Sequence, residues 1–431
     1  MIKILVIKLI DLLHLKGESL VCKGDFQKAH YLFGLKHLIM YIRGKIRRRS
    51  LISNSFWTDQ SSASMKGNIN KYKKSIEKKQ NIDYYSTNSA DILKNKKIYL
   101  MVNRFQNTGK GIEHDVGRTY INTSQQIGIN LKHYYLDHFQ FETDSCTVES
   151  ELKAFNTDYL IVGNYWWLNK SDGERKLSFL RQMKDELGFK VIILLADPHA
   201  YGLEEEVRRI FDIADKIVSM SSWTPLFSFD EFQSKLSTME YFTDSNLFFP
   251  EMKEIDMSFS GVNQPERAEI IAFAAFVGSE LKLKTKFHLR RSGTNWATTT
   301  EKIMDDETYI DVLRKSNAVI NIGQKGTKEN GKQIHIINGR VPEAIACGAA
   351  LIQYKPKDDT SLNLDNYYTP WKEYLPFSNR RELKEIIYLL KYEPDTISEI
   401  GHNGRQRYLE CYNSVKSWER MLRITGENIR N

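Results

Sequence analysis

Short apolar runs alternate with longer amphipathic stretches from residue 97 onward. Apolar runs bounded by polar residues predict buried strands, and apolar positions that recur at helical spacing predict helices. In the first half of this region the predicted strands are 98–102, 159–162, 191–195 and 216–219, and the helices between them include 113–127, 173–187 and 204–213. This alternation predicts a parallel sheet that is covered by helices on both faces.

The same pattern restarts after Pro250. Its predicted strands are 255–260, 286–289, 318–322 and 350–354, and its helices are 265–276, 306–315, 341–347, 380–390 and 396–411. We therefore predict an α/β protein with two Rossmann-like, doubly wound domains that face one another across a cleft. The first would span 97–248 and the second 249–431, with a last helix that could cross back to the first domain.

Residues 1–96 form a separate, basic extension. Two helices are predicted within 1–45, and a stretch rich in Ser, Asn and Lys, 50–95, predicts a linker. Gly24 and Asp25 separate the two helices. A single helical hairpin cannot bury its own apolar face, so we expect it to pack on another part of the chain.

Composition places the chain among globular proteins, with 41% hydrophobic and 27% charged residues. The apolar start is interrupted by Lys3, Lys8 and Asp11, is shorter than the ~20 residues of a membrane span, and is not followed by a signal cleavage site. The cysteines form no CxxC pair, so we expect a cytoplasmic protein. They are Cys22, Cys146, Cys347 and Cys411. The basic N-terminal extension would place the protein peripherally at the inner face of the membrane.

The net charge of +8 is concentrated near the N-terminus. Residues 1–97 hold 20 Lys and Arg against 7 Asp and Glu, a net of +13, so the rest of the chain sums to −5. Such an extension could dock on anionic lipid headgroups or on nucleic acid. A solvated tether is the alternative that the charge run leaves open.

The stretch 338–349 carries the most informative chemistry. Gly339 precedes a short predicted helix that begins with Arg340 and carries Glu343 in its first turns. A helix N-terminus favours a diphosphate, and Arg340 can add a planar fork of donors. Glu343 is an acceptor suited to two vicinal ribose hydroxyls, although an ordinary helix with an exposed Glu would show the same residues.

This stretch resembles the donor-site signature of group-1 glycosyltransferases, and is similar to the spore-maturation glycosyltransferase-like branch. The pattern is Arg, two residues, Glu-Ala, two residues, Cys-Gly, and the turn after 256–261, the strand 316–322 and the helix at 400–405 resemble the family in the same order. The resemblance covers about 240–425 well and 97–240 more weakly. It implies the GT-B fold, a nucleotide-sugar donor in the second domain and an acceptor bound mainly by the first.

The resemblance also implies roles by position. Glu343 would hold the ribose, and Arg340 with the backbone near Val341 would contact the diphosphate. The other residues placed at the donor are Gly261, Arg267, Gly323 and His335.

His335 marks a departure from the family. Many retaining relatives carry an acidic residue at this position, where it touches the donor sugar, so the retaining or inverting outcome stays open.

The glycine loop 108–114 resembles the loop that these enzymes place beneath the donor. Gly109, Gly111 and His114 are its candidate residues, although the spacing fits neither GxGxxG nor a Walker loop. A plain strand-to-helix turn is the alternative.

Asp197 and His199 are the candidate catalytic residues. They directly follow the predicted strand 191–195, and side chains at the carboxyl ends of parallel strands face the ligand. A carboxylate and an imidazole there could deprotonate an acceptor hydroxyl, although Asp beside Pro198 could merely cap a turn. His114 and Asp115 are the reserve pair.

Three tryptophans, Trp166, Trp167 and Trp223, could stack on sugar rings or belong to the core. No cluster has metal-ligand spacing, so we expect no cofactor and a metal-independent reaction. The expected partners are a nucleotide-sugar donor, a glycan or lipid-linked acceptor and an anionic membrane surface. A nucleic-acid-modifying glycosyltransferase and a non-catalytic nucleotide-sugar-binding module are the rival hypotheses.

Overall fold

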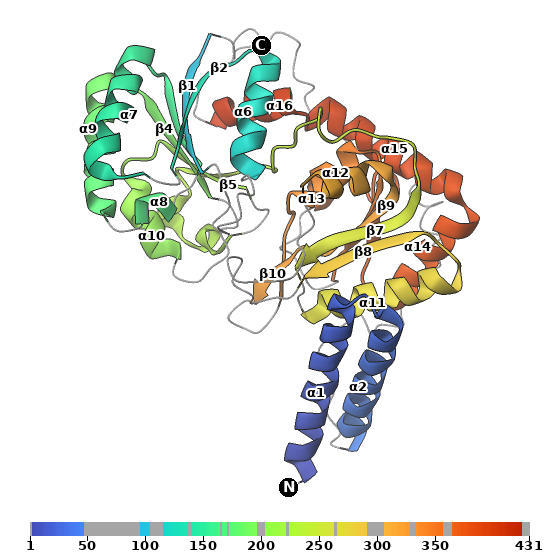
Figure 1. The fold of residues 1–431 in the computed structure, drawn as a ribbon. Coiled ribbons are helices and arrows are strands. Elements are labelled where there is room, and N and C mark those ends of the chain that lie inside the picture. Colours follow the sequence, from blue (N-terminus) through green and yellow to red (C-terminus); the bar gives the residue numbers. More distant parts are fainter. Residues whose placement is uncertain are drawn as a thin grey trace.

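The computed structural model describes residues 2–46, 95–103, 115–136, 139–163, 166–169, 172–195, 203–220, 224–262, 265–290, 306–327, 333–356 and 364–424. They form two parallel-sheet domains and an N-terminal helical hairpin (Figure 1). The predicted α/β class with a helical extension is confirmed. None of the described helices combines the length and the apolar character of a membrane span.

The first domain is built on a six-stranded parallel sheet in the order β2-β1-β3-β4-β5-β6. Its strands are β1 (Lys97–Val102), β2 (Asn130–Tyr135), β3 (Tyr159–Val162), β4 (Lys190–Leu195), β5 (Lys216–Ser219) and β6 (Leu236–Thr238). Its helices are α6 (Asp115–Ile127), α7 (Phe141–Phe155), α8 (Trp166–Asn169), α9 (Gly173–Leu187) and α10 (Leu203–Phe211). The central strands are buried on both faces, which is why they are continuous apolar runs.

The second domain is built on a five-stranded parallel sheet in the order β13-β12-β9-β7-β8. Its strands are β7 (Ile255–Val262), β8 (Thr285–Arg290), β9 (Ser316–Asn321), β12 (Ala350–Tyr354) and β13 (Leu375–Phe377), beside a small antiparallel pair, β10 (Gln324–Thr327) and β11 (Gln333–His335). Its helices are α11 (Pro265–Glu280), α12 (Asp306–Lys315), α13 (Arg340–Ala346), α14 (Arg380–Tyr392) and α15 (Pro394–Cys411).

The last helix, α16 (Ser414–Ile424), packs on the first domain beside α6. Trp418 is fully buried, donates from its indole N–H to the hydroxyl of Thr123 (3.0 Å), and lies edge-on to the stacked rings of Tyr120 and Phe242. Chain residues more than two hundred positions apart therefore share one hydrophobic core.

The segment that joins the two domains is held by hydrogen bonds to helix ends. The ammonium of Lys253 donates to the carbonyl oxygens of Arg314 and Cys347, each at 2.8 Å, and these residues lie at the C-terminal ends of α12 and α13. A cation is favoured at this end of a helix. Burial lowers the pKa of Lys253 to about 8.

The hairpin of α1 (Ile2–Cys22) and α2 (Phe26–Ile46) packs on α11 and projects away from the second domain (Figure 1). Phe33 is fully buried and lies against Gly17, where an added Cβ would come within 2.5 Å of the ring. The sequence predicted both helices and their need for a packing partner, and α11 is that partner.

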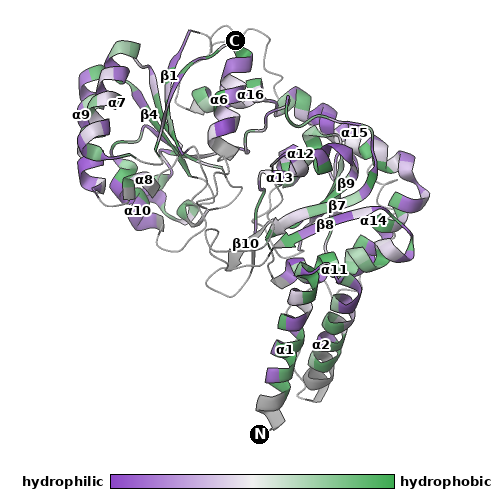
Figure 2. Ribbon diagram, viewed as in Figure 1, coloured by the Kyte–Doolittle hydropathy of each residue, from purple (hydrophilic) through white to green (hydrophobic). Residues whose placement is uncertain are grey.

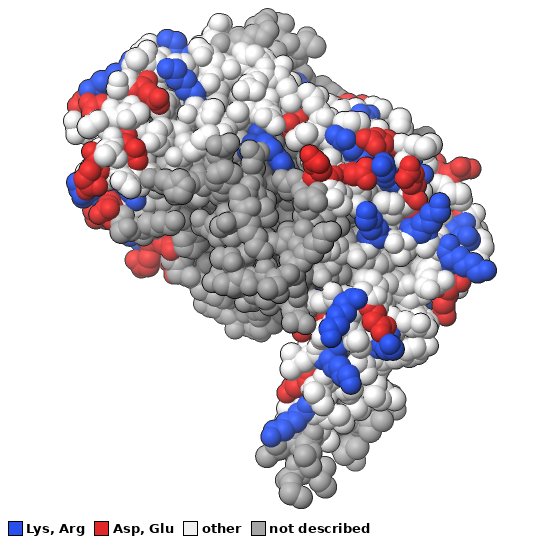
Figure 3. Space-filling model, in the orientation of Figure 1, with Lys and Arg blue, Asp and Glu red and all other residues white. Residues whose placement is uncertain are grey.

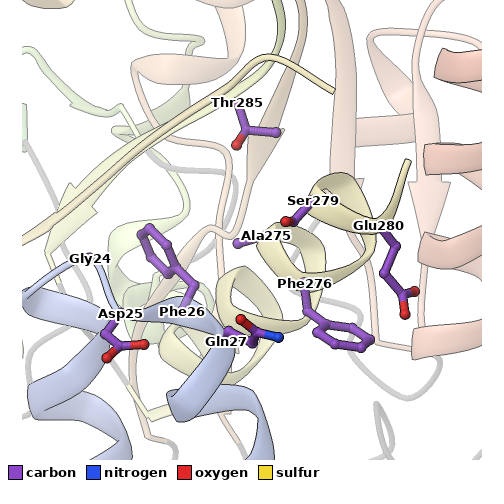
Figure 4. Close-up of a pocket in the computed structure, with 9 residues that line it drawn as sticks. All are labelled: Gly24, Asp25, Phe26, Gln27, Ala275, Phe276, Ser279, Glu280 and Thr285. Atoms are coloured by element: carbon purple, nitrogen blue, oxygen red, sulfur yellow. The ribbon is translucent and has the colours of Figure 1, made fainter. Parts of the chain in front are cut away.

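A hollow of about 410 Å³ lies where the hairpin turn meets the C-terminal half of α11 (Figure 4). Phe26 and Phe276 supply its apolar side chains, and the carboxylate of Asp25 beside them is paired with Lys28 (2.7 Å). The lining residues are Gly24, Asp25, Phe26, Gln27, Ala275, Phe276, Ser279, Glu280 and Thr285.

A buried polar cluster fastens the hairpin to α11. The carboxylate of Glu269, which is 2% exposed, is paired with the ammonium of Lys36 and bonded to Nε2 of His37 at 2.7 Å. Nδ1 of His14 lies 3.5 Å from the same carboxylate. Burial raises the pKa of Glu269, but its bonds to His14 and His37 and the charge of Lys36 outweigh burial, so this pKa lies well below its usual range.

We expect Glu269→Gln to destabilise the protein by about 3–5 kcal/mol, because it leaves the buried Lys36 charge without its counter-charge. Urea unfolding monitored by circular dichroism measures the change. Glu280→Gln, an exposed position on the same helix, serves as the control. Equal unfolding midpoints for the two variants would contradict a fastening role for the cluster.

Candidate functional site

The carboxyl ends of β7 and β9 mark the point where the second sheet reverses its strand order. The chain passes from β7 outward to β8 on one side, and β9 lies on the other side of β7. In open parallel sheets, ligands bind beside the carboxyl ends of the strands at such a switch point. Gly261 lies at the end of β7, and Asn321 ends β9.

Two glycines allow the chain to approach itself closely at these strand ends. A Cβ on Gly323 would lie 2.0 Å from the carbonyl oxygen of Ile336, whose N–H donates back to Gly323 (3.0 Å). A Cβ on Gly261 would lie 3.0 Å from the Phe259 ring and 3.3 Å from a terminal nitrogen of Arg340. Glycine at these positions thus brings the segment before α13, and Arg340 itself, against the sheet.

Arg340 is held at the switch point by contacts with both strands. One terminal nitrogen donates to the side-chain oxygen of Asn321 (3.0 Å), and its guanidinium carbon lies 5.2 Å from the centroid of the Phe259 ring. The amide of Asn321 in turn donates to Gln353 in β12 (2.8 Å). This chain of contacts fixes the planar guanidinium in one place, which favours bidentate binding of phosphate oxygens.

Glu343 lies on the same short helix as Arg340. It is partly exposed, and one of its oxygens accepts a hydrogen bond from the hydroxyl of Tyr309 in α12 (2.5 Å). Gly339, one turn away, lies near both the other oxygen of Glu343 and the ring of Tyr241. Tyr241 packs on the core that the first domain shares with α16. Glu343 therefore lies on the side of α13 that faces the segment joining the two domains.

The N-terminus of α13 offers fewer amide donors than the sequence suggested. The N–H of Val341 donates to the carbonyl oxygen of Asn338 (3.0 Å), and that of Glu343 donates to Gly339 (3.2 Å). Pro342 has no N–H, and α13 is only seven residues long. The side chain of Arg340 is therefore the stronger anion-binding group of this turn.

Arg267 and His335 are buried next to the switch point. The terminal nitrogens of Arg267, which is 5% exposed, donate to the carbonyl oxygens of Val262 (2.6 Å) and Ile322 (2.7 Å), where β7 and β9 end. His335 is 1% exposed, and its Nε2 lies 3.1 Å from a carboxylate oxygen of Glu266. These contacts give both side chains a positioning role, and donor contact by either stays a prediction.

The predicted residues of the first domain lie mostly outside the described residues. This holds for the catalytic candidates Asp197 and His199, which follow β4, and for Gly109, Gly111 and His114 of the glycine loop. The same is true of Trp223 and of the predicted linker 50–95 except for its last residue, Asn95. Asp115 begins α6, and Trp166 begins α8.

Trp167 belongs to the core of the first domain. It is 4% exposed and lies edge-on to Phe139 at 4.9 Å between ring centroids. Of the two alternatives for this residue, the structure therefore favours core packing over sugar stacking.

Tyr309, Asn321 and Gln353 belong to the site although the sequence did not single them out. Asn321 and Gln353 are polar residues buried in apolar strands, and this is a signal that could have found them. Tyr309 carries no such signal, because only the packing of α12 on α13 brings it to Glu343. Among the described residues, no group of three or more His, Cys, Asp or Glu could hold a metal ion.

Part of the second domain matches a known protein family. Residues 273–423, which include β9, Arg340 and Glu343, match the family described as glycosyl transferase-like. The group-1 resemblance of the second domain is confirmed, and the finer resemblance to the spore-maturation branch stays a prediction. No curated protein matches the chain.

A solved glycosyltransferase shares the two-domain fold, and two others are similar. An alpha-glucosyltransferase in complex with UDP and a 13-mer DNA containing an HMU base is 14% identical over 77% of this chain and 99% of its own, with a TM-score of 0.50. HepE from Anabaena in complex with UDP is 9% identical over 77% and 99% of the two chains (TM-score 0.49). A Rickettsia africae glycosyltransferase is 11% identical over 78% and 100% (TM-score 0.49). The predicted GT-B fold is confirmed.

Gly323→Ala is expected to destabilise the protein by about 1–3 kcal/mol, because the new methyl group overlaps the backbone of Ile336. Thermal unfolding measures the loss. Gly34→Ala is the matched control and is expected to stabilise the protein. Nothing lies within 4 Å of its Cβ position in α2, and Ala is favoured over Gly in a helix by about 0.5–1 kcal/mol. A Gly323→Ala protein as stable as Gly34→Ala would refute the close approach.

Proposed function

We propose that this protein transfers a sugar from a nucleotide-sugar donor to an acceptor hydroxyl, with the donor held at the carboxyl ends of the second sheet. One observation carries the proposal: Arg340 and Glu343 share a short helix at the switch point of that sheet. Both lie inside the range that matches the glycosyl transferase-like family.

The two side chains suit the two ends of a nucleoside diphosphate. The guanidinium of Arg340, braced by Asn321 and Phe259, is a fixed cation that can bind phosphate oxygens and stabilise the charge that develops as the diphosphate leaves. The carboxylate of Glu343 can accept bonds from two ribose hydroxyls, and Tyr309 holds it in place. The bound UDP of the alpha-glucosyltransferase with this fold supports a diphosphate leaving group.

Asp197 and His199 are our proposed catalytic residues. They follow β4, whose carboxyl end belongs to the first domain's sheet, and could orient the acceptor and take its proton. We further propose that the reaction needs no metal ion, since Arg340 supplies positive charge at the diphosphate. Turnover that is unchanged by EDTA would support this.

The acceptor is proposed to be a glycan or a lipid-linked sugar, in the synthesis of a surface polysaccharide or glycoconjugate. Nucleic acid is the second candidate, because the alpha-glucosyltransferase that shares this fold is complexed with DNA and because residues 1–97 are strongly basic. Transfer of labelled sugar to lipid extracts or to duplex DNA separates the two.

Glu343→Ala is expected to weaken nucleoside diphosphate binding by about 1–3 kcal/mol, because the ribose hydroxyls lose their acceptor. Isothermal titration calorimetry with UDP, GDP and ADP measures the change. Glu399→Ala removes an exposed carboxylate from α15 and should bind as the wild type does. Wild-type affinity in the Glu343→Ala protein would remove Glu343 from the site, and a wild-type protein that binds none of the three would refute the proposed donor.

Asp197→Asn and His199→Ala are expected to keep nucleotide affinity and to lower kcat by at least about 100-fold, the contribution expected of a proton-transfer group. Donor turnover with and without acceptor measures the effect. Asp185→Asn, an exposed position on α9, is the control. Wild-type turnover in both test variants would place the chemistry on other residues.

A further inference from the structure

The helical hairpin exposes an unusual share of large apolar side chains. Of the twelve exposed large hydrophobic residues among those described, seven lie on the hairpin, although it makes up a small part of the chain. Leu12 and Leu15 in α1 are 59% and 62% exposed, and Leu38 in α2 is 53% exposed. The seven residues are Ile7, Leu9, Leu12, Leu15, Tyr31, Leu35 and Leu38. Figure 2 shows hydrophobic residues along both helices. An exposed apolar surface of this kind marks an interaction site.

The same hairpin is basic. Between Asp25 and Asp59 the sequence has seven Lys or Arg residues and no Asp or Glu, so α2 contains no acidic residue. Near its start, α1 carries Lys3 and Lys8 against Asp11. Figure 3 shows Lys and Arg side chains, together with acidic ones, on the described part of the hairpin. The hairpin therefore combines exposed leucines with an excess of positive charge.

The attachment of the hairpin is firm, so its exposed part cannot fold back on the domain without breaking buried contacts. The Glu269 cluster holds its central part on α11, and Phe33, which packs against Gly17 of the other hairpin helix, belongs to the hydrophobic core that includes α11. Residues 2–12 and 38–46 lie beyond these contacts along the two helices, at the end that projects from the second domain (Figure 1). We refer to these two segments as the hairpin tip.

We propose that the hairpin tip docks the protein on an anionic lipid surface. The exposed leucines would enter the boundary between headgroups and acyl chains, and the lysines and arginines would bind lipid phosphates. Apolar burial and charge attraction act together in such a helix, and each basic residue near an anionic bilayer contributes to binding.

Charge favours lipid over a second copy of this chain. Two hairpin tips packed together would bring their positive charges into proximity, with only Asp11 on each tip to offset them. The apolar side chains in turn favour lipid over nucleic acid, because exposed leucines gain nothing from a phosphate backbone. An anionic bilayer satisfies both properties of the tip.

Docking would set the position of the donor site relative to the membrane. The hairpin is fastened to α11 at Glu269, and Arg267, two residues earlier in the same helix, donates hydrogen bonds to the carbonyl oxygens at the ends of β7 and β9. At 1.5 Å per residue, each 21-residue helix is about 31 Å long. The donor domain would thus stand at a fixed distance from the lipid surface, within reach of an acceptor anchored there.

Vesicle co-sedimentation of the full-length protein tests the proposal. The wild type is expected to bind phosphatidylcholine vesicles that contain about 30 mol % phosphatidylglycerol, to bind pure phosphatidylcholine at least about tenfold more weakly, and to be released by high salt. Equal binding to both vesicles, or to neither, would overturn the proposal.

Two sets of variants separate the apolar and the charged contributions. Leu9→Ser combined with Leu12→Ser should lower binding about tenfold, whereas Met252→Ser combined with Tyr392→Ser removes similarly exposed apolar groups elsewhere and should not. Lys8→Glu should lower binding at least about fivefold, whereas Lys391→Glu, on α14, should not. Equal losses in a test variant and its control would overturn the assignment to the tip.

Two further measurements examine the rejected partners. If sedimentation velocity shows that the wild type is a dimer and the leucine variant a monomer, the partner of the hairpin tip is a second copy of this chain and not a lipid surface. Tighter binding to duplex DNA than to anionic vesicles would replace the lipid surface by nucleic acid. Nucleotide affinity of the leucine variant, measured by calorimetry, should equal that of the wild type, so a failure of this proposal is distinct from a failure of the proposed transferase function.

Discussion

The close approach of the chain to itself at the ends of β7 and β9 is the constraint on which the second domain depends. Gly323 lets the backbone of Ile336 lie where any side chain would collide, and Arg267 occupies the carbonyl oxygens at both strand ends. Without these two features, the segment that leads into α13 could not lie against the sheet. Arg340 and Glu343 owe their positions to this arrangement.

Helix α11 connects three parts of the structure. Its first turn carries Glu266 and Arg267 beside the switch point, its second turn carries Glu269 in the buried cluster, and its C-terminal half meets the hairpin turn. Buried polar groups are costly unless they are paired, so each of these contacts specifies one arrangement of the helix. The hairpin and the candidate donor site are therefore held by the same rigid element.

Sequence patterns predicted those elements in which buried and exposed residues follow a regular order. The bounds of helix α12 and strand β12 were predicted to the residue. Helix α12 has apolar residues at regular helical spacing, and β12 is a continuous apolar run with clear ends. Strand β2 was not predicted, since it is an edge strand whose six residues are mostly exposed or only partly buried. Strand β13 is three residues long and contains Pro376, so it offers almost no pattern.

The candidate site divides in the same way. Arg340 and Glu343 could be proposed from the sequence because their spacing is local, within one turn of a helix. The partners that hold them were not found, because Tyr309 and Asn321 are 34 and 19 residues away from the groups they bind and meet them only through packing. The burial of His335 beside Glu266, 69 positions earlier, is likewise a property of the tertiary structure.

The return of α16 to the first domain has a consequence for synthesis. Trp418, Met421 and Leu422 are interior residues of a core whose other members lie between Ile98 and Phe242. A nascent chain emerging from the ribosome therefore cannot complete that core when the first domain has been translated. Its sheet must wait, partly uncovered, until the second domain has been made and α16 leaves the exit tunnel.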